Sequence, residues 1–196
     1  MLLSQDEARF PMVPTLTATL GVKGHRPVVG SWDCTHLLYV FAVLNVVTAT
    51  LHATTVESPK DATRKTGKSK NWRLQEGFAY HLRHVGRLYP KDKCPRVVLV
   101  IDNAPWHAGE PVRQALADNP HLELYRLPSY SPKLNVIERF RKLLRRRATH
   151  NRLFDTLADL KRSIRNSLCY FQTLRHRIAS LIAGCYEAKA TASSNS

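Results

Sequence analysis

The sequence predicts an α/β fold with a mixed five-stranded sheet, three antiparallel strands followed by two parallel ones, and helices on both faces. Runs rich in Val, Leu, Thr and aromatic residues fill the first third of the chain, which favours β-strands. Later, segments of helical period alternate with apolar runs, as expected of parallel strands joined by right-handed crossovers. The 196 residues, of which 43% are hydrophobic, suffice for one domain, expected over residues 1–187 with a disordered tail over 188–196.

The first expected strand begins with the short apolar run Leu2 to Ser4 and ends in the acidic pair Asp6-Glu7. It is therefore expected to place these acids at one end of the sheet. After a loop punctuated by proline, three further segments are rich in strand-forming residues, with short polar breaks between them. We expect them to lie antiparallel in the same sheet. These segments are Val28 to Trp32, Leu37 to Val47 and Leu51 to Glu57.

The helical period begins after residue 71. Apolar residues recur at three- and four-residue steps between Leu74 and Val85, which predicts an amphipathic helix over Trp72 to Leu88 packed on the sheet. The uninterrupted apolar run of residues 97–101 closes with Asp102 and predicts a strand buried on both faces. Further helices are expected over Glu110 to Asp118, Lys133 to Arg147 and Asp155 to Ile182, and a strand over Leu122 to Leu127.

The chain is strongly basic, with 30 Lys and Arg against 15 Asp and Glu and a formal charge of +15. Such a field attracts a polyanion, and nucleic acid is the expected partner; a basic surface kept for solubility, or a ribosomal or chaperone contact, stays open. The charge concentrates in an expected loop over residues 58–71 and in residues 139–147, although either can be an ordinary solvated face. The residues expected to contact nucleic acid are Lys65, Lys68, Lys70, Arg139, Arg141, Lys142, Arg145 and Arg146.

The cysteines and the N-terminus predict an intracellular protein. Cys34, Cys94, Cys169 and Cys185 are widely spaced with no C-x-x-C pair, which favours buried free thiols over a zinc site or disulfides. The N-terminus lacks the basic flank and long apolar core of a signal peptide. The longest apolar stretch is far short of the roughly 20 residues that cross a bilayer. We therefore expect a cytoplasmic, nucleoid-associated protein without membrane contact.

Three acids are candidates for a metal site. Asp102 ends a strand of parallel type, where ligands gather in such sheets, and Asp6 lies on a strand expected to be its neighbour. Glu138 lies near the start of the helix that follows a Pro-Ser-Tyr-Ser-Pro turn. Packed carboxylates repel one another unless cations share the site. Oxygen ligands suit Mg²⁺ or Mn²⁺, and two such ions about 4 Å apart can serve an in-line phosphoryl displacement.

Each acid also has an ordinary structural explanation. Asp102 can cap the loop after its strand in an Asx-turn. Glu138 follows Asn135 by three residues, so the two can form a capping box, and Glu138 can also pair with Lys142 one turn later. The first acidic pair of the chain can lie on the surface where a strand ends. Composition and spacing alone leave these alternatives open.

Two runs of sequence surround the second and third acids. One is Val-Leu-Val-Ile-Asp-Asn-Ala-Pro-Trp-His, ending at His107, and the other is Leu-Pro-Ser-Tyr-Ser-Pro-Lys-Leu-Asn-Val-Ile-Glu-Arg, ending at Arg139. They resemble acidic motifs of the mariner-like DDE transposases, especially their bacterial insertion-sequence branch. Between Asp102 and Glu138 lie 138 − 102 − 1 = 35 residues, a separation similar to that in this superfamily and in retroviral integrases. The resemblance extends from Asp6 to about residue 164.

The resemblance implies a ribonuclease H-like fold and the catalytic domain of a cut-and-paste DNA transposase. In such an enzyme Asp6, Asp102 and Glu138 hold two Mg²⁺ or Mn²⁺ ions, which promote phosphodiester cleavage at transposon ends and strand transfer into target DNA. Double-stranded DNA is the implied partner, bound by a homodimer. Asn103 and His107 match motif positions beside the second acid, where they support the metal ligands or contact phosphate.

The sequence departs from the family pattern at several positions. Val136 stands where Pro is usual, a mild change at a helix start. Arg141 stands where Trp is common, one turn from Glu138, and is expected to pair with that acid and compete with metal. No helix-turn-helix region precedes Asp6, so recognition of transposon ends is expected from a segment or reading frame outside this sequence. The alternative functions are a catalytically inactive DNA-binding remnant and another ribonuclease H-like nuclease, such as a Holliday-junction or RNA:DNA-hybrid enzyme.

Overall fold

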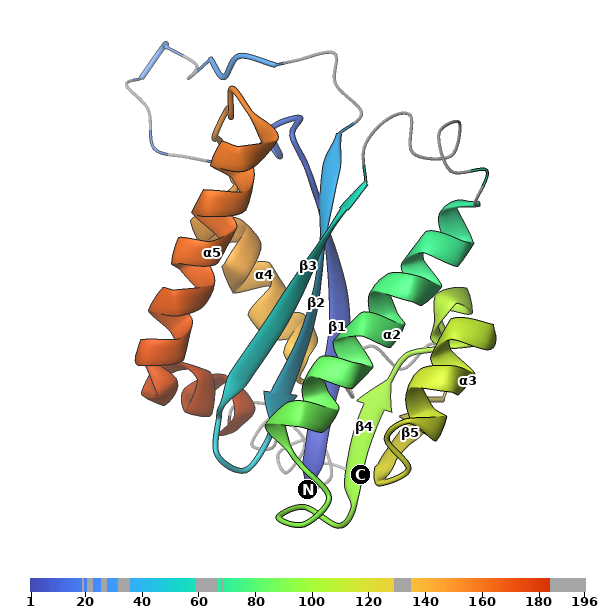
Figure 1. The fold of residues 1–196 in the computed structure, drawn as a ribbon. Helices are drawn as coiled ribbons and strands as arrows, with labels where there is room; N and C mark the ends of the chain where they lie inside the picture. Colours follow the sequence, from blue (N-terminus) through green and yellow to red (C-terminus); the bar gives the residue numbers. More distant parts are fainter. Residues whose placement is uncertain are drawn as a thin grey trace.

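A five-stranded mixed sheet forms the centre of the computed structural model, which describes residues 1–18, 20, 23–25, 28–31, 36–58, 67, 69–128 and 135–183 (Figure 1). The strands are β1 (Leu2–Pro11), β2 (Leu37–Asn45), β3 (Leu51–Ser58), β4 (Val97–Ile101) and β5 (Leu122–Arg126). They lie in the order β3-β2-β1-β4-β5; β1, β2 and β3 are antiparallel, β4 is parallel to β1, and β5 is parallel to β4. The predicted sheet is therefore confirmed.

Helices cover both faces of the sheet, as predicted (Figure 1). They are α2 (Lys70–Leu88), the short 3-10 helix η1 (Pro105–His107), α3 (Glu110–Ala117), α4 (Ile137–Ala148) and α5 (Leu157–Thr173). On one face, α4 contacts β1 while α5 contacts β2 and β3. On the other face, α2 contacts β2 and β3, and α3 and η1 pack against α2. Two hydrophobic clusters result, one under α4 and α5 and the other under α2 and α3.

The two faces of β1 carry different side chains. Ala8 and Phe10 belong to the cluster under α4, whereas Leu3 belongs to the cluster under α2. Because successive side chains of a strand point to opposite faces, Asp6 lies on the α4 face and Glu7 on the α2 face. The two acids that adjoin in sequence are therefore separated by the sheet.

Two strand predictions are corrected. β1 continues to Pro11 and pairs with β2 along its length, so Asp6 lies within the strand rather than at its end. The strand expected over Val28 to Trp32 is absent from the described residues 28–31, and Val28 is 93% exposed. Trp32 lies outside the described residues. Strand-forming composition did not suffice here because these residues have neither a partner strand nor a buried face.

The helices differ from expectation mainly at their ends. α2 begins at Lys70, where Ser69 Oγ accepts a hydrogen bond from the N–H of Trp72 at 3.1 Å. α4 begins at Ile137, and residues 133 and 134 of the expected helix are not described. The single helix expected to reach residue 182 is broken at Leu174, whose φ of −100° and ψ of 57° leave the helical region, and helical structure resumes over 175–183. The expected tail also lies outside the described residues.

The described cysteines are free thiols, as predicted, but not buried ones. Cys94 is half-buried and Cys169 is exposed, because the apolar stripe of α5 turns Leu168 and Phe171 inward and leaves Cys169 outside. Cys34 and Cys185 are not among the described residues. In the described part of the chain, no helix is both long enough and apolar enough to cross a membrane.

Candidate catalytic site

Asp6 is a buried carboxylate on β1, between β2 and β4, and it faces α4. Its side chain is 8% exposed. Oδ1 accepts a hydrogen bond from the N–H of Glu7 at 3.0 Å, whereas Oδ2 has no hydrogen-bond partner among the described residues. Arg141 of α4 forms an ion pair with this carboxylate, with 3.4 Å between Arg141 Nε and Asp6 Oδ2. The charge of Asp6 is thus balanced by a guanidinium from the neighbouring helix.

Asp102 is the first residue after β4, at the carboxyl end of this parallel strand. β1 and β4 pair as far as Ser4 opposite Val100, and the charge of Asp102 contributes to the raised pKa of Asp6, so the two acids lie near each other at this end of the sheet. Oδ1 of Asp102 accepts the N–H of Ala104 at 3.0 Å, which confirms the expected Asx-turn. Half of the Asp102 side chain is exposed. The residue therefore closes a turn and still faces solvent.

Glu138 lies in the first turn of α4, with 23% of its side chain exposed. Its Oε1 lies 3.5 Å from Arg141 Nη2 and 3.4 Å from Lys142 Nζ, so both expected pairings are confirmed. One guanidinium therefore contacts Asp6 on the strand and Glu138 on the helix. The carboxylates of these two acids converge on the same cation.

Asn135 fixes the start of α4 against β1. Its Oδ1 accepts a hydrogen bond from Ser4 Oγ at 2.6 Å, and its Nδ2 donates to the carbonyl of Gln5 at 3.1 Å. The expected capping box with Glu138 is wrong, because the Asn135 side chain bonds to the strand and the N-cap, Val136, makes no side-chain capping bond. These two buried bonds instead hold the first turn of α4 beside the acidic stretch of β1.

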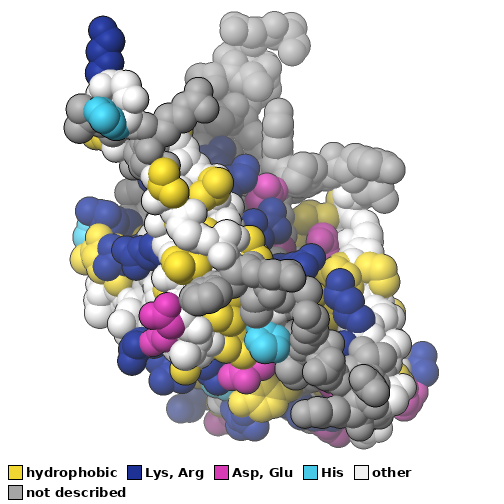
Figure 2. Space-filling view, turned by 90° about the horizontal axis from the view of Figure 1, so that it is seen from above, with side chains coloured by type: hydrophobic (Ala, Val, Ile, Leu, Met, Phe, Trp, Pro, Cys, Tyr) yellow, Lys and Arg dark blue, Asp and Glu magenta, His cyan; other side chains and the backbone are white. Residues whose placement is uncertain are grey.

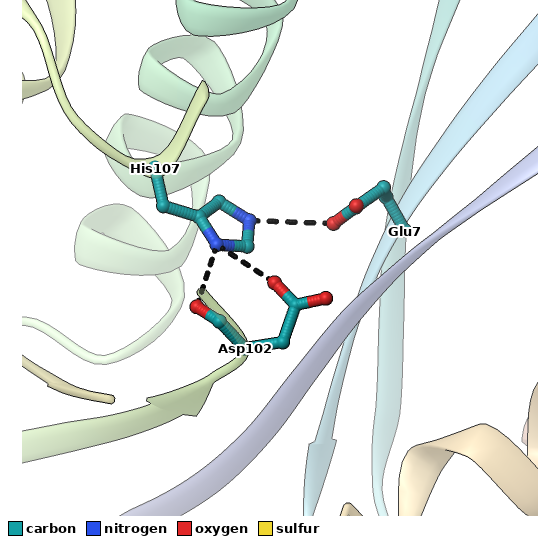
Figure 3. A group of neighbouring side chains, drawn as sticks. All are labelled: Glu7, Asp102 and His107. Atoms are coloured by element: carbon teal, nitrogen blue, oxygen red, sulfur yellow. Dashed lines mark hydrogen bonds and ion pairs between the residues drawn. The ribbon is translucent and has the colours of Figure 1, made fainter. Parts of the chain in front are cut away.

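His107 joins Glu7 and Asp102 in a second polar group (Figure 3). Its side chain is fully buried. Nδ1 lies 3.1 Å from Asp102 Oδ1, and Nε2 lies 3.3 Å from Glu7 Oε2. One ligand atom from each of the three residues lies within 4.8 Å of the others, a spacing that a metal ion can bridge. Asp102 thus belongs to this group and also adjoins Asp6.

The protein sets different pKa values for these groups. Burial raises the pKa of Asp6, Arg141 opposes the rise, and the charges of Glu7 and Asp102 add to it, so that the pKa reaches about 7. The hydrogen bond with His107 lowers the pKa of Asp102, although partial burial opposes this. Burial disfavours the charged imidazole of His107, but its contacts with Asp102 and Glu7 outweigh burial and raise its pKa to about 9. A buried acid whose pKa is raised beside other acids is typical of functional sites.

Residues 1–161 match the model of one protein family, the DDE superfamily endonucleases. The chain belongs to this family. The matched stretch contains all three candidate acids, together with Arg141 and His107. No curated protein matches the sequence.

This DDE endonuclease domain has the fold of the Mos1 mariner transposase. A pre-cleavage Mos1 transpososome matches with a TM-score of 0.61 at 16% sequence identity, covering 95% of this chain and 55% of that chain. The Mos1 mariner paired-end complex with Mn matches with a TM-score of 0.60 at the same identity and coverage. The Mos1 catalytic domain matches with a TM-score of 0.56 at 15% identity, covering 95% and 81% of the two chains. The ribonuclease H-like fold is confirmed, and the chain spans about half the length of the Mos1 chains in these complexes.

The candidate residues of the DDE domain fit a divalent metal ion. Mg²⁺ and Mn²⁺ prefer carboxylate oxygens, which Asp6, Asp102 and Glu138 supply. Oδ2 of Asp6 is buried with no hydrogen-bond partner among the described residues, and burial raises the pKa of this acid to about 7. Arg141 contacts two of the three acids. A metal ion and this guanidinium would therefore compete for the same oxygens.

Asn103 and His107 both make contacts within the protein, although Asn103 is exposed and His107 is buried. Asn103 Nδ2 donates to the carbonyl of Leu127 at 2.7 Å and so links the ends of β4 and β5. His107 is buried beside Asp102, out of reach of a DNA phosphate in this conformation. Of the two expected roles, support of the site agrees better with these contacts than phosphate binding.

Some of the residues expected to contact nucleic acid are exposed. In Figure 2, Lys and Arg side chains are spread over the face seen from above, which is the end of the sheet toward which β1 and β4 run. Lys65 and Lys68 lie outside the described residues. The exposed members of the set are Lys70, Arg139, Lys142 and Arg146.

Two other members of this set bind within the domain. Arg145 Nη2 donates to the carbonyl of Arg9 at 3.0 Å, and its guanidinium lies 5.7 Å from the centre of the Phe10 ring. Arg141 contacts the acids, as described above. These two arginines therefore join α4 to β1 in this conformation, although their place in the sequence suggested an outward basic stripe.

Sequence reasoning missed Glu7 and Asn135 as parts of the site. Glu7 follows Asp6 in sequence, but successive side chains of a strand point to opposite faces of the sheet. Glu7 therefore lies on the α2 face, where it contacts His107. Asn135 was interpreted as a cap within α4 rather than as a bridge to β1. An available signal was the position of Glu7 directly after Asp6 and of Asn135 three residues before Glu138.

Proposed function

We propose that this DDE endonuclease domain is the catalytic domain of a DNA transposase, and that Asp6, Asp102 and Glu138 hold two Mg²⁺ or Mn²⁺ ions. The reactions are phosphodiester cleavage at transposon ends and strand transfer into target DNA. The observation that carries the proposal is the contact of one guanidinium with Asp6 of β1 and Glu138 of α4, with Asp102 at the end of the strand beside β1, in a member of this family.

The bound ions would activate a water or a 3′-hydroxyl for in-line attack and stabilise the departing oxygen. The chain itself supplies a fixed set of carboxylates. Oδ1 of Asp102 is held by the N–H of Ala104 and by His107, and in Figure 3 its other oxygen points away from His107. Asp6 is fixed within the sheet, and Asn135 fixes the turn that carries Glu138. Such rigid placement is what a preorganised site requires.

The proposed partner is double-stranded DNA, bound by a homodimer in a nucleoid-associated protein. Exposed Lys70, Arg139, Lys142 and Arg146 supply charge for phosphate contacts, which fix position on DNA without reading its sequence. Phosphate binding of this kind weakens steeply as salt concentration rises. The solved relatives include a Mos1 paired-end complex and a Mos1 strand transfer complex.

A cleavage assay tests the proposal. Purified protein with Mn²⁺ is expected to nick supercoiled plasmid, and Asp102→Asn, which can keep the Asx-turn, is expected to lower the rate by about 10³-fold because a metal ligand is lost. Asp118→Asn is the matched control, since Asp118 is a surface acid paired with Arg83. Equal nicking by wild type and Asp102→Asn, with both proteins folded, would refute the proposal.

A second candidate function is a catalytically inactive DNA-binding remnant. The observation that favours it is Arg141, which supplies the cation between Asp6 and Glu138 from within the chain. Calorimetric titration with Mn²⁺ separates the two functions. Saturable binding that Asp102→Asn weakens supports the enzyme, whereas DNA binding without any saturable Mn²⁺ binding supports the remnant.

A further inference from the structure

We infer that Glu7 is a positioning residue that acts through His107 to orient the carboxylate of Asp102. The inference rests on the proposed function, in which Asp102 is a metal ligand. It assigns to Glu7 a role distinct from that of Asp6, its neighbour in sequence. Glu7 would not touch metal or DNA itself.

The three residues form a chain of contacts through the imidazole ring (Figure 3). Glu7 Oε2 lies 3.3 Å from His107 Nε2 on one edge of the ring, and Nδ1 on the other edge lies 3.1 Å from both Oδ1 and the backbone carbonyl of Asp102. The His107 side chain is fully buried, and the Glu7 side chain is 10% exposed. Water therefore competes little for the contact between Glu7 and His107, whereas Asp102 is half-exposed and also accepts the N–H of Ala104.

The position of the ring is fixed by its surroundings. His107 packs against Phe78 of α2 with 4.5 Å between ring centres, and the Trp106 ring lies nearly perpendicular to it with 6.3 Å between ring centres. The carbonyl of His107 accepts a hydrogen bond from Arg126 Nη2 at 3.1 Å, which ties η1 to the end of β5. A ring held by its aromatic neighbours and through its backbone can transmit the orientation of Glu7 to Asp102.

A metal ion bound by all three residues is the alternative explanation of this group, and the geometry disfavours it. The two ring nitrogens face different carboxylates on opposite edges, whereas one ion can be bound by only one of them. At 3.1 and 3.3 Å the two contacts are ion pairs between the imidazole and the carboxylates, and the Glu7 contact lacks hydrogen-bond geometry. A proton on each nitrogen therefore accounts for the group better than an ion.

The expected consequence is control over how Asp102 binds metal. Carboxylate–histidine pairs beside metal sites orient ligands, and their loss typically costs 10- to 100-fold in metal affinity. Here the orienting pair is Glu7 and His107. Removing the Glu7 side chain frees the ring edge at Nε2 and loosens the contact at Nδ1. Glutamine at this position can still bond to Nε2, so it should preserve much of the orientation.

The test compares Glu7→Ala and Glu7→Gln with Glu57→Ala, the control, since Glu57 pairs with Lys161 on the surface. Mn²⁺ affinity is measured by electron paramagnetic resonance without DNA, and the His107 ring by ¹⁵N NMR without metal. We expect Glu7→Ala to weaken Mn²⁺ binding about tenfold and to shift the Nδ1 resonance. Glu7→Gln should stay within about threefold of wild type, and Glu57→Ala should match wild type.

Two results would overturn the inference. One is folded Glu7→Ala with wild-type Mn²⁺ affinity and an unchanged Nδ1 resonance. If Glu7→Ala does not fold, the wild-type spectrum decides, because the inference requires a hydrogen-bonded proton on Nδ1 of His107, and its absence is the second contrary result. Failure of the proposed function looks different: Asp102→Asn itself would then leave Mn²⁺ affinity unchanged.

Discussion

Arg141 Nε lies 3.4 Å from Oδ2 of Asp6, and Nη2 of the same guanidinium lies 3.5 Å from Oε1 of Glu138. A side chain from α4 thus supplies positive charge at the point where the proposed metal ligands converge. The carboxylates that would bind Mg²⁺ or Mn²⁺ are already paired in this conformation. Metal affinity should therefore depend on how easily Arg141 yields these oxygens.

Replacing Arg141 should strengthen metal binding. Arg141→Gln removes the competing cation, and we expect Mn²⁺ affinity to rise about tenfold, equivalent to about 1.4 kcal/mol, which suits two partly exposed ion pairs. Arg139→Gln is the matched control, because it removes the same charge from an exposed position on the same helix. Calorimetry measures both. An equal change in the two variants would show that only net charge matters.

Metal binding should also depend on pH. The pKa of Asp6 is raised to about 7, so below that pH a metal ion must displace a proton from this acid. We expect Mn²⁺ affinity to fall about tenfold for each pH unit below about 7 and to depend little on Asp6 above it. Calorimetry in buffers of different ionisation enthalpy counts the protons released. Affinity that does not change between about pH 5.5 and 7 would contradict this pKa.

The contacts of His107 should stabilise the metal-free fold at neutral pH. Because its pKa rises from 6.5 to about 9 on folding, the stabilisation is complete below about pH 6.5 and is lost as pH rises through about 9. Wild type should exceed His107→Asn by about 1 to 3 kcal/mol in unfolding free energy at pH 6. Urea denaturation across this range measures the difference. A difference that stays constant with pH would refute the assignment.

Asn135 should matter for both stability and activity. Asn135→Ala removes two buried hydrogen bonds and leaves Ser4 Oγ without its partner, at a cost of about 1 to 3 kcal/mol. Because the first turn of α4 would loosen, cleavage should fall further than the loss of folded protein explains. Asn166→Ala, at an exposed position on α5, serves as control. Full activity of folded Asn135→Ala would show that its bonds to β1 do not position Glu138.

The fold was predictable wherever the residue pattern of a single segment determines its secondary structure. The apolar run that ends in Asp102 predicted β4 and the acid at its carboxyl end. Apolar residues at helical spacing predicted α2. The boundaries of β1 were not predictable in this way, because its length is set by pairing with β2 on one side and β4 on the other. The break at Leu174 also had no local signal, since neither Gly nor Pro lies near it.

The site was predictable in its acids but not in their partners. The sequence motifs identified Asp6, Asp102 and Glu138. The spacing of one helical turn between Glu138 and Arg141 predicted their ion pair. The contact of Arg141 with Asp6 joins residues 135 positions apart, and that of Glu7 with His107 joins residues on different elements. Such contacts depend on which face of β1 each side chain occupies. A shift of the strand register by one residue would move Asp6 and Glu7 each to the other face of the sheet.

A crystal structure of the protein soaked with Mn²⁺ tests the central claim most directly, because anomalous scattering locates the ion. The account predicts a peak bonded to carboxylate oxygens of Asp6 and Asp102, with Glu138 alongside and Arg141 withdrawn from Asp6. A peak on Glu7 and His107 instead, or none near Asp6 at saturating Mn²⁺, would contradict it.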